Sequence, residues 1–238
     1  MIRSIAASIV MCLVLFQIGG CTTAAALGGL ANLGGGMAQN FEYQKELQIL
    51  PKYSGLEGKR IAVVVDADMS LLYDYPALVN TVTGGVTARI GHYVPNASLV
   101  NPDAVIAWQW RTPQWNALPY GQIAQTLNVE RVVHIEIYEF RLNPPGNRWL
   151  WEGVAGANVS VIEADAIDPD LFVDTFPIVA KFPQVEHIDR SHVAQADVEK
   201  GLLYKFIQEI TWLFHEHLEP KYPDKYQGDL KQAEEKNS

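Results

Sequence analysis

Cysteine and charge are both scarce in this chain of 238 residues. It contains two cysteines, and charged residues make up 19% of it. Aspartate and glutamate outnumber lysine and arginine by 27 to 18, which gives a formal net charge of −9. Nucleic-acid binding depends on lysine and arginine facing phosphates. The acidic balance therefore predicts no nucleic-acid partner and no polybasic membrane surface.

Several familiar sequence patterns are also missing. There is no GxSxG, P-loop or GxGxxG motif, and nothing in the sequence indicates a cofactor. The apolar run at residues 5–18 is too short to cross about 30 Å of hydrocarbon, which takes about 20 residues. The hydrophobic fraction of 48% is nevertheless typical of a globular protein. The length allows one domain of roughly 160–180 residues with additional tails.

The first 20 residues have the pattern of a secretory signal peptide. Arg3 supplies a positive charge, residues 5–18 form the apolar region, and two glycines precede Cys21. The sequence Ile18-Gly19-Gly20-Cys21 resembles the lipobox of bacterial lipoproteins. This resemblance implies removal of residues 1–20 and lipidation (palmitate or a related acyl chain) of Cys21. The alternative is an ordinary secreted protein with a cysteine at this point.

Lipidation of Cys21 predicts the location of the protein. Cleavage before it would leave one cysteine, so the mature chain could form no internal disulfide. Two or three acyl chains hold a protein on a membrane far longer than one chain does. By the enterobacterial sorting rule, an aspartate directly after the lipidated cysteine prevents transport to the outer membrane. This chain has Thr22 at that position, which favours the outer membrane. We therefore expect a lipid-anchored protein of the bacterial cell envelope that faces the periplasm.

The rest of the chain divides into three predicted parts. Residues 21–57 form a lipidated tether rich in alanine and glycine, because the five glycines between 28 and 36 disfavour a helix. A membrane-associating segment is the alternative for residues 22–40. Residues 58–220 form the folded domain, and residues 221–238 form a polar tail.

Strand patterns in the domain predict a small mixed sheet of α/β (α+β mixed) type. The apolar, β-branched run at residues 61–66 suits a strand that is buried on both faces. Residues 131–142 and 149–162 are extended segments on either side of a turn at 143–147, which predicts an antiparallel hairpin. Residues 94–100 suit a short strand. Prolines restrict a further strand, at 176–185, to a sheet edge.

Helical patterns predict a layer of helices on this sheet. Residues 79, 82, 86 and 90 form one apolar stripe, which Gly84 and Gly85 weaken. Helix-start signals stand at residues 101–103 and 118–119. The longest pattern, at residues 194–218, predicts a closing C-terminal helix that Pro220 terminates, with Lys205 and Glu209 one turn apart.

Three local landmarks, at residues 58–65, 123–133 and 158–162, resemble a known family over about residues 58–220. They are similar to the α/β domain of the curli-secretion lipoprotein and of the amino-terminal domain of the Tol-Pal system's TolB protein. Asn128 stands where that pattern usually has glycine, and asparagine tolerates the left-handed backbone. The resemblance implies a non-catalytic accessory or assembly factor of a cell-envelope complex. Its partner would be an envelope protein or a second copy of the chain.

Histidines offer weak metal-site candidates. His187 and His192 lie in one loop and could hold zinc or nickel in a metal-dependent hydrolase, although nothing fixes their geometry. His215 and His217 are spaced i, i+2, whereas ligand pairs on a helix are spaced i, i+4. We therefore expect these last two rings to point to nearly opposite faces, and we predict no metal site.

Two groups of residues that include carboxylates could form functional sites or could be ordinary surface and turn residues. His134 and Glu136 share one face of a predicted strand, where they could be an acid/base pair or simply a polar surface. An acidic loop offers oxygen ligands that calcium favours, but it lacks the DxDxDG pattern and Asp-Pro is common in turns. Its aspartates are Asp165, Asp168, Asp170 and Asp174.

The tryptophans Trp108, Trp110 and Trp115 form the candidate partner surface. Tryptophan and arginine are enriched at interface hot spots, and Arg111 lies between these rings. The same rings could be the stacking surface of a glycan-binding or small-molecule-binding lipoprotein, and core packing is a further alternative. If the segment is helical, Trp108 and Trp110 face apart, which leaves one of them exposed.

Overall fold

The computed structural model describes residues 46–184 and 188–220. Residues Gln48–His217 form one compact unit, and the few described residues outside it extend the strands at its two ends. The elements are β1 (Glu46–Ile49), β2 (Arg60–Ala67), α3 (Met69–Asp74), α4 (Leu78–Tyr93), β3 (Ser98–Leu99), α5 (Pro102–Arg111), η1 (Trp115–Ala117), α6 (Tyr120–Leu127), β4 (Arg131–Arg141), β5 (Leu150–Trp151), β6 (Gly153–Glu163), β7 (Asp174–Phe182), β8 (Ile188–Asp189), α7 (Gln195–Thr211) and β9 (His217–Pro220).

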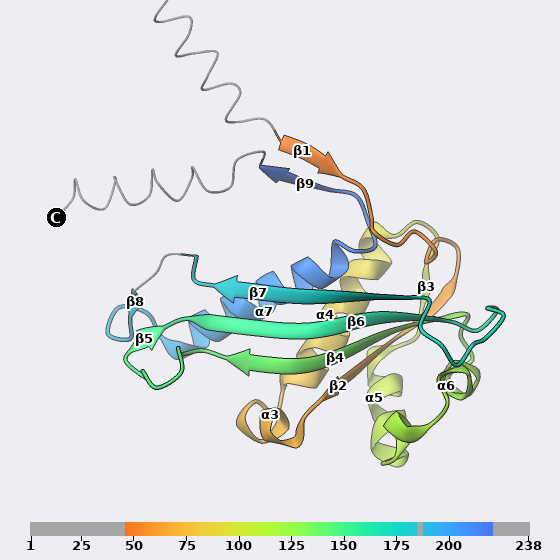
Figure 1. Ribbon diagram of the computed structural model, residues 1–238, viewed down its shortest axis with the longest axis horizontal. Helices are drawn as coiled ribbons and strands as arrows, with labels where there is room; N and C mark the ends of the chain where they lie inside the picture. The colour runs from red at the N-terminus through yellow and green to blue at the C-terminus, as the bar shows by residue number, and fades with distance from the viewer. Residues whose placement is uncertain (1–45, 185–187, 221–238) are drawn as a thin grey trace, which may run out of the picture. The chain divides into compact units, whose positions relative to one another are not determined.

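A five-stranded mixed sheet with the order β3-β2-β4-β6-β7 organises the compact unit (Figure 1). β2 pairs in parallel with β3 and β4, whereas β4, β6 and β7 are antiparallel neighbours. The register places Val63 beside Val133 and Val133 beside Val161. The predicted α/β class is confirmed, and so is the predicted antiparallel hairpin between β4 and β6.

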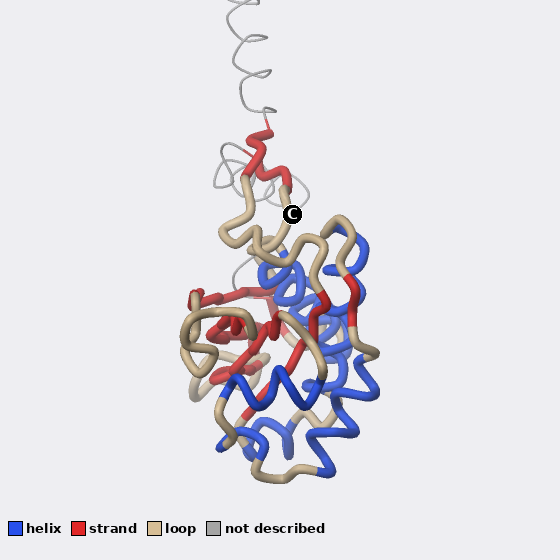
Figure 2. Tube along the Cα trace, turned by 90° about the vertical axis from the view of Figure 1, so that its right-hand side faces the viewer, coloured by secondary structure: helices blue, strands red, loops and turns tan. Residues whose placement is uncertain are grey.

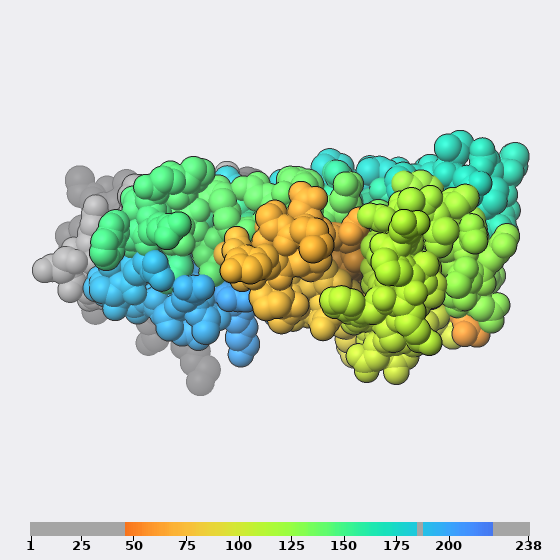
Figure 3. Space-filling model, turned by 90° about the horizontal axis from the view of Figure 1, so that it is seen from below, coloured from red at the N-terminus to blue at the C-terminus, as the bar shows by residue number. Residues whose placement is uncertain are grey.

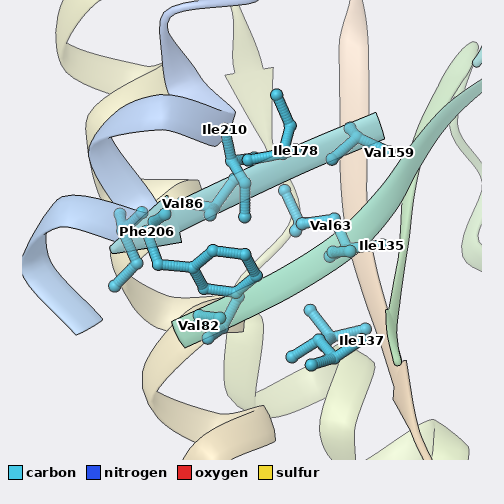
Figure 4. Packing of buried hydrophobic residues seen from close by; sticks show 14 of the residues in the cluster. Val63, Val82, Val86, Ile135, Ile137, Val159, Ile178, Phe206 and Ile210 are labelled. Carbon is cyan, nitrogen blue, oxygen red and sulfur yellow. The ribbon is translucent and has the colours of Figure 1, made fainter. Parts of the chain in front are cut away.

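The first face of the sheet packs against α4 and α7. Alternate residues of the strands, among them Val63, Ile135 and Val159, point into this core. Phe206 of α7 is fully buried, and Figure 4 shows its ring among these strand residues and Val82 and Val86 of α4. The side chains that alternate onto this face of each strand therefore form the main core.

The second face is covered only over part of its length, by α5, η1 and α6. Its smaller core combines Ala62 and Val64 of β2 with Val105 of α5 and Ile123 of α6. β2 is thus buried on both faces, as its continuous apolar run predicts. Figure 2 shows the helices in blue beside the strands in red, with much of the helical chain on one side of them.

Two local predictions are confirmed at helix ends. The Asn101 side chain accepts a hydrogen bond from the backbone N–H of Asp103 at 2.9 Å, which caps the start of α5. Asn128 ends α6 with φ = 52°, in the left-handed region that asparagine tolerates.

β7 is an edge strand, as Pro177 within it predicts.

The closing helix is shorter than the sequence pattern predicts. It ends at Thr211, and the chain then turns instead of continuing to residue 218. Leu213 and Phe214 stay buried in this turn because Tyr53 holds it: the backbone N–H of Tyr53 donates to the Leu213 carbonyl at 3.0 Å, and the Tyr53 and Phe214 rings meet edge to face.

The region before residue 58 contributes to the core, which the predicted tether boundary does not anticipate. Leu56 is fully buried and Tyr53 is 9% exposed. Further toward the N-terminus, β1 pairs with β9 in a two-stranded sheet, and the Gln48 amide donates to the Glu216 carboxylate at 2.8 Å. Neither strand has a repeating pattern long enough for the sequence to predict it.

Candidate interaction sites

The predicted lipidation site lies outside the described residues. Cys21 precedes Glu46, where the description begins, so the anchor and the leader at residues 1–20 remain predictions, as does the tail at residues 221–238. Among the residues that the structure describes, no helix has both the length and the apolar character that a membrane crossing requires.

The three tryptophans of the candidate partner surface do not lie together in solvent. Trp115 in η1 is 8% exposed and belongs to the smaller core, and Trp108 of α5 packs beside it with ring centroids 6.0 Å apart. Trp110 is 81% exposed. The helix therefore turns Trp108 and Trp110 apart, and Trp110 is the ring of the three that a partner can reach.

Other exposed apolar side chains flank the same end of the sheet as Trp110. Its neighbour Gln109 donates a side-chain hydrogen bond to the Val65 carbonyl at 2.9 Å, which fixes this turn of α5 against the end of β2. Met69 and Tyr73 of α3, which follows β2 directly, are 82% and 88% exposed. Figure 3 shows α3 (orange) and α5 (yellow-green) on one face. We refer to Met69, Tyr73 and Trp110 as the β2-end surface.

His134 lies in an aromatic enclosure rather than on an open polar face. The rings of Trp115, Tyr120 and Phe172 have their centroids 6.2, 6.1 and 5.8 Å from its ring. Burial among them lowers the pKa of His134, against the smaller opposing effect of the carboxylates of Asp66 and Glu136. A neutral imidazole is the form that this environment favours.

Asp66 and Glu136 are direct neighbours on the parallel strands β2 and β4. Burial raises the pKa of Asp66, and the nearby charge of Glu136 adds to this effect. Two adjacent carboxylates and a neutral histidine can hold or exchange protons. Ser160 is the cross-strand neighbour of His134 on β6, but its hydroxyl is hydrogen-bonded to that of Thr175 at 3.0 Å, so the arrangement assigns no reaction.

The acidic loop is held by ion pairs and local hydrogen bonds. Asp165 pairs with the buried guanidinium of Arg131, which lowers the pKa of Asp165. Asp170 accepts a hydrogen bond from the backbone N–H of Gly121 at 2.9 Å. Asp168 accepts one from the backbone N–H of Asp170 at 3.1 Å. Over the described ranges, no group of three His, Cys, Asp or Glu side chains could hold a metal ion.

Arg131 organises a network that sequence reasoning missed. Its guanidinium donates to the carbonyl of Gly55 at 3.2 Å and lies 3.6 Å from the Glu163 carboxylate. The Tyr53 hydroxyl donates to that same carboxylate at 2.5 Å. Burial is the main cause that raises the pKa of this hydroxyl, and the hydrogen bond is the second. Gly55 is 76 residues from Arg131 and Tyr53 is 110 residues from Glu163 in the chain, so no local pattern could identify these contacts.

The remaining histidines are placed by stacking or by loop contacts. His215 stacks on Tyr93 with centroids 4.4 Å apart, and His217 stacks on Trp212 at the same distance. Burial lowers the pKa of His215. His192 lies beside the turn that Asp189 caps, where Asp189 accepts from the backbone N–H of Ser191. His187 lies outside the described residues.

A pocket of about 530 Å³ lies at the end of β4, in the turn that leads to β5. It was not expected from the sequence, where residues 143–147 indicate only a turn. Figure 3 shows the green β4–β5 segment on the same face as α3. The lining residues are Tyr75, Arg141, Leu142, Asn143, Pro144, Gly146, Arg148 and Trp149.

The comparisons with known proteins found similar solved structures of low sequence identity. No protein-family model and no curated protein matches the chain. The solved structures similar to it include a PelC dodecamer from Paraburkholderia phytofirmans, with a TM-score of 0.42, 11% identity and coverage of 72% of this chain and 97% of that one. Lipoprotein GNA1162 from Neisseria meningitidis is similar with a TM-score of 0.42 and 9% identity, over 63% of this chain and 96% of that one.

The hypothetical protein CT253 from Chlamydia trachomatis is also similar, with a TM-score of 0.39 and 18% identity over 63% of this chain and 92% of that one. All three are bacterial proteins, and one is a lipoprotein by description. At these identities no function transfers from them to this chain. The similarity to the curli-secretion lipoprotein and to TolB stays a prediction from the sequence.

Proposed function

We propose that this chain is a lipid-anchored, non-catalytic accessory or assembly factor of a bacterial cell-envelope complex. Cys21, behind its apolar leader, would hold it at the membrane, facing the periplasm and at the outer membrane by the sorting rule. The folded unit would then present its contact surface to an envelope protein.

The observation that carries this role is the β2-end surface. Met69, Tyr73 and Trp110 are each more than 80% exposed and flank one end of one strand. Methionine, tyrosine and tryptophan are the residue types that interfaces concentrate, and a tryptophan held by a well-fixed helix loses little entropy on binding. A protein partner that covers these side chains is the simplest reason for their exposure.

The alternative in which three tryptophans stack on a glycan fits the structure less well. Trp115 is enclosed in the smaller core and Trp108 packs beside it, which leaves Trp110 as the exposed indole of the three. A different part of the molecule, the pocket at the end of β4, is better suited to a ligand.

Cell fractionation tests the anchor. Wild-type protein should stay with the membranes, whereas a Cys21→Ala variant should appear in the soluble periplasmic fraction. Equal membrane retention of both proteins would contradict lipid anchoring through this residue.

In-cell crosslinking of the tagged protein, followed by mass spectrometry, tests the accessory role. We expect a reproducible envelope protein that is lost in Trp110→Ala. The matched control is Tyr204→Ala, which removes an aromatic ring that is 63% exposed on α7. Crosslinks between copies of the chain alone would instead indicate a homo-oligomer. A partner that persists in Trp110→Ala and in Tyr73→Ala would rule out the β2-end surface.

A further inference from the structure

We propose that the pocket between Tyr75 and the β4–β5 turn binds a saccharide that carries a carboxylate, such as a uronic acid. The pocket lies in the compact unit and shares no residue with the β2-end surface. Its volume of about 530 Å³ falls within the usual range for small-molecule sites, which is about 300–1,000 Å³.

One side of the pocket is flat and apolar. The Trp149 indole is 77% exposed, and the backbone on both sides of it is fixed: its N–H donates to the Asn147 side chain at 2.9 Å, and its carbonyl accepts from the Arg190 N–H at 3.0 Å. Pro144 and the buried Leu142 continue the apolar lining. A planar ring on a fixed backbone is a suitable platform for the C–H face of a sugar ring.

The arginines at or near the pocket differ in whether a carboxylate pairs with them. Arg141 is neutralised by Glu139 at 2.8 Å and by Glu152 at 3.3 Å. Arg148 also lines the pocket, and its guanidinium has no carboxylate or hydrogen-bond acceptor within the described part of the chain. Arg190 reaches the Arg148 carbonyl at 3.1 Å and likewise has no carboxylate partner there.

An arginine that lines a pocket and has no carboxylate partner in the described part of the chain is notable when the formal net charge is −9. The planar guanidinium of arginine matches a carboxylate with two parallel hydrogen bonds. A ligand carboxylate at Arg148 would supply the partner that the protein does not provide. An uncharged ligand would leave this group without one.

Neutral hydrogen-bonding groups complete the recognition surface. The Asn143 amide N–H donates to the Leu150 carbonyl at 2.7 Å, which fixes the side chain and leaves its oxygen as an acceptor. The Tyr75 ring is held edge to face against Phe140 with centroids 4.7 Å apart. Its hydroxyl has no hydrogen-bond partner within the described ranges. Hydroxyls around a sugar ring can satisfy both groups, whereas a purely apolar carboxylate would leave them unpaired.

Calorimetric titration of the full chain in detergent micelles tests the proposal. The probes are the disaccharides of galacturonic, glucuronic and mannuronic acid, each with its neutral counterpart of the same linkage. At least one acidic disaccharide should bind saturably, and its neutral counterpart should bind at least about tenfold more weakly. Added salt should weaken the binding of the acidic disaccharide more than that of its neutral counterpart, because the carboxylate contact is electrostatic.

The chain contains a matched control for the site. Arg148→Ala/Trp149→Ala should lower the affinity by tenfold or more. Arg111→Ala/Tyr204→Ala removes an arginine and an aromatic ring from exposed positions outside the pocket and should leave it unchanged. Circular dichroism of both double variants checks that they are folded, and Arg148→Lys, which keeps the charge, should retain part of the affinity.

Three results would overturn the assignment. The first is no saturable binding of any acidic disaccharide to the wild-type protein. The second is equal loss of affinity in both double variants. The third is binding of benzoate, a flat ring with a carboxylate and no hydroxyls, as tight as that of the saccharide. The third result would show that the hydroxyl contacts play no part and that the ligand is not a sugar.

Discussion

Gly85 of α4 lies against Ile207 of α7, so closely that a β-carbon at residue 85 would stand 2.6 Å from Ile207 Cδ1. Its neighbour Gly84 would meet nothing within 4 Å. The glycine pair that weakens the helix prediction therefore has two different explanations. Gly85 permits close packing of the two helices on the main core, and nothing in the structure requires glycine at position 84.

We predict opposite effects for alanine at these two adjacent positions. Gly84→Ala should stabilise the protein by about 0.5–1 kcal/mol, because alanine loses less backbone entropy in a helix. Gly85→Ala should destabilise it by about 1–3 kcal/mol through overpacking against the buried Ile207. Urea unfolding of both variants measures the difference, and effects of the same sign would contradict this account of the α4–α7 contact.

Phe206→Ala should cost about 3–5 kcal/mol of unfolding free energy, because this fully buried ring fills the centre of the main core. Tyr204→Ala, two residues away on the same helix, should change it by less than about 0.5 kcal/mol, since that ring is 63% exposed. Thermal unfolding of the two variants is the measurement. A small effect at residue 206 would mean that α7 does not pack as described.

Arg131→Met should destabilise the protein by about 1–3 kcal/mol. It removes the guanidinium that Glu163, Asp165 and the Gly55 carbonyl share, and it leaves the partly buried Glu163 without its cation. Arg131→Lys should recover only part of this loss, because an ammonium group cannot reproduce the planar fork. Urea unfolding at neutral pH distinguishes the variants, and full recovery with lysine would show that charge alone matters.

The His134 environment predicts a loss of stability in mild acid. Burial lowers the pKa of this imidazole in the folded state. As the pH falls below about 6.5, the imidazole is therefore protonated in the unfolded chain before it is protonated in the folded protein. Stability should therefore decline from there until the pH reaches the lowered folded-state pKa. The raised pKa of Asp66, also due to burial, acts in the opposite direction at lower pH, since the folded state then gains the proton more easily.

His134→Gln should make this decline less steep, because glutamine does not titrate, and the part that remains would come from His215, whose pKa burial also lowers. Unfolding free energies at half-unit steps between pH 5 and pH 8, measured for wild type and variant, give the two slopes. A variant slope as steep as that of wild type would mean that another group causes the decline. Titration of the His134 ring by NMR gives its folded-state pKa directly.

Local patterns predicted the parts of the fold that depend on local physics. The run at residues 61–66, the β4–β6 hairpin and the Asn101 cap each follow from neighbouring residues, and each is present. Pro177 marks β7 as an edge strand for the same reason, since proline has no N–H to donate to a second neighbour.

The features that sequence reasoning missed depend on distant contacts. Apolar periodicity continues past Thr211, but Tyr53 binds the following turn, so the helix ends early. Trp115 looks available in the sequence and is enclosed by packing from α5 and β4. The pocket combines Tyr75 with residues 141–149, two segments that the sequence gives no reason to connect.

The pairing of β1 with β9 has a mechanical consequence. Figure 1 shows the two strands antiparallel, so the chain enters at Glu46 and leaves at Pro220 at the same end of the ribbon. A pulling force applied through these two residues would separate the strands one hydrogen bond after another, as a zipper opens, instead of shearing all of them together. The ribbon would thus lengthen by opening strand from strand.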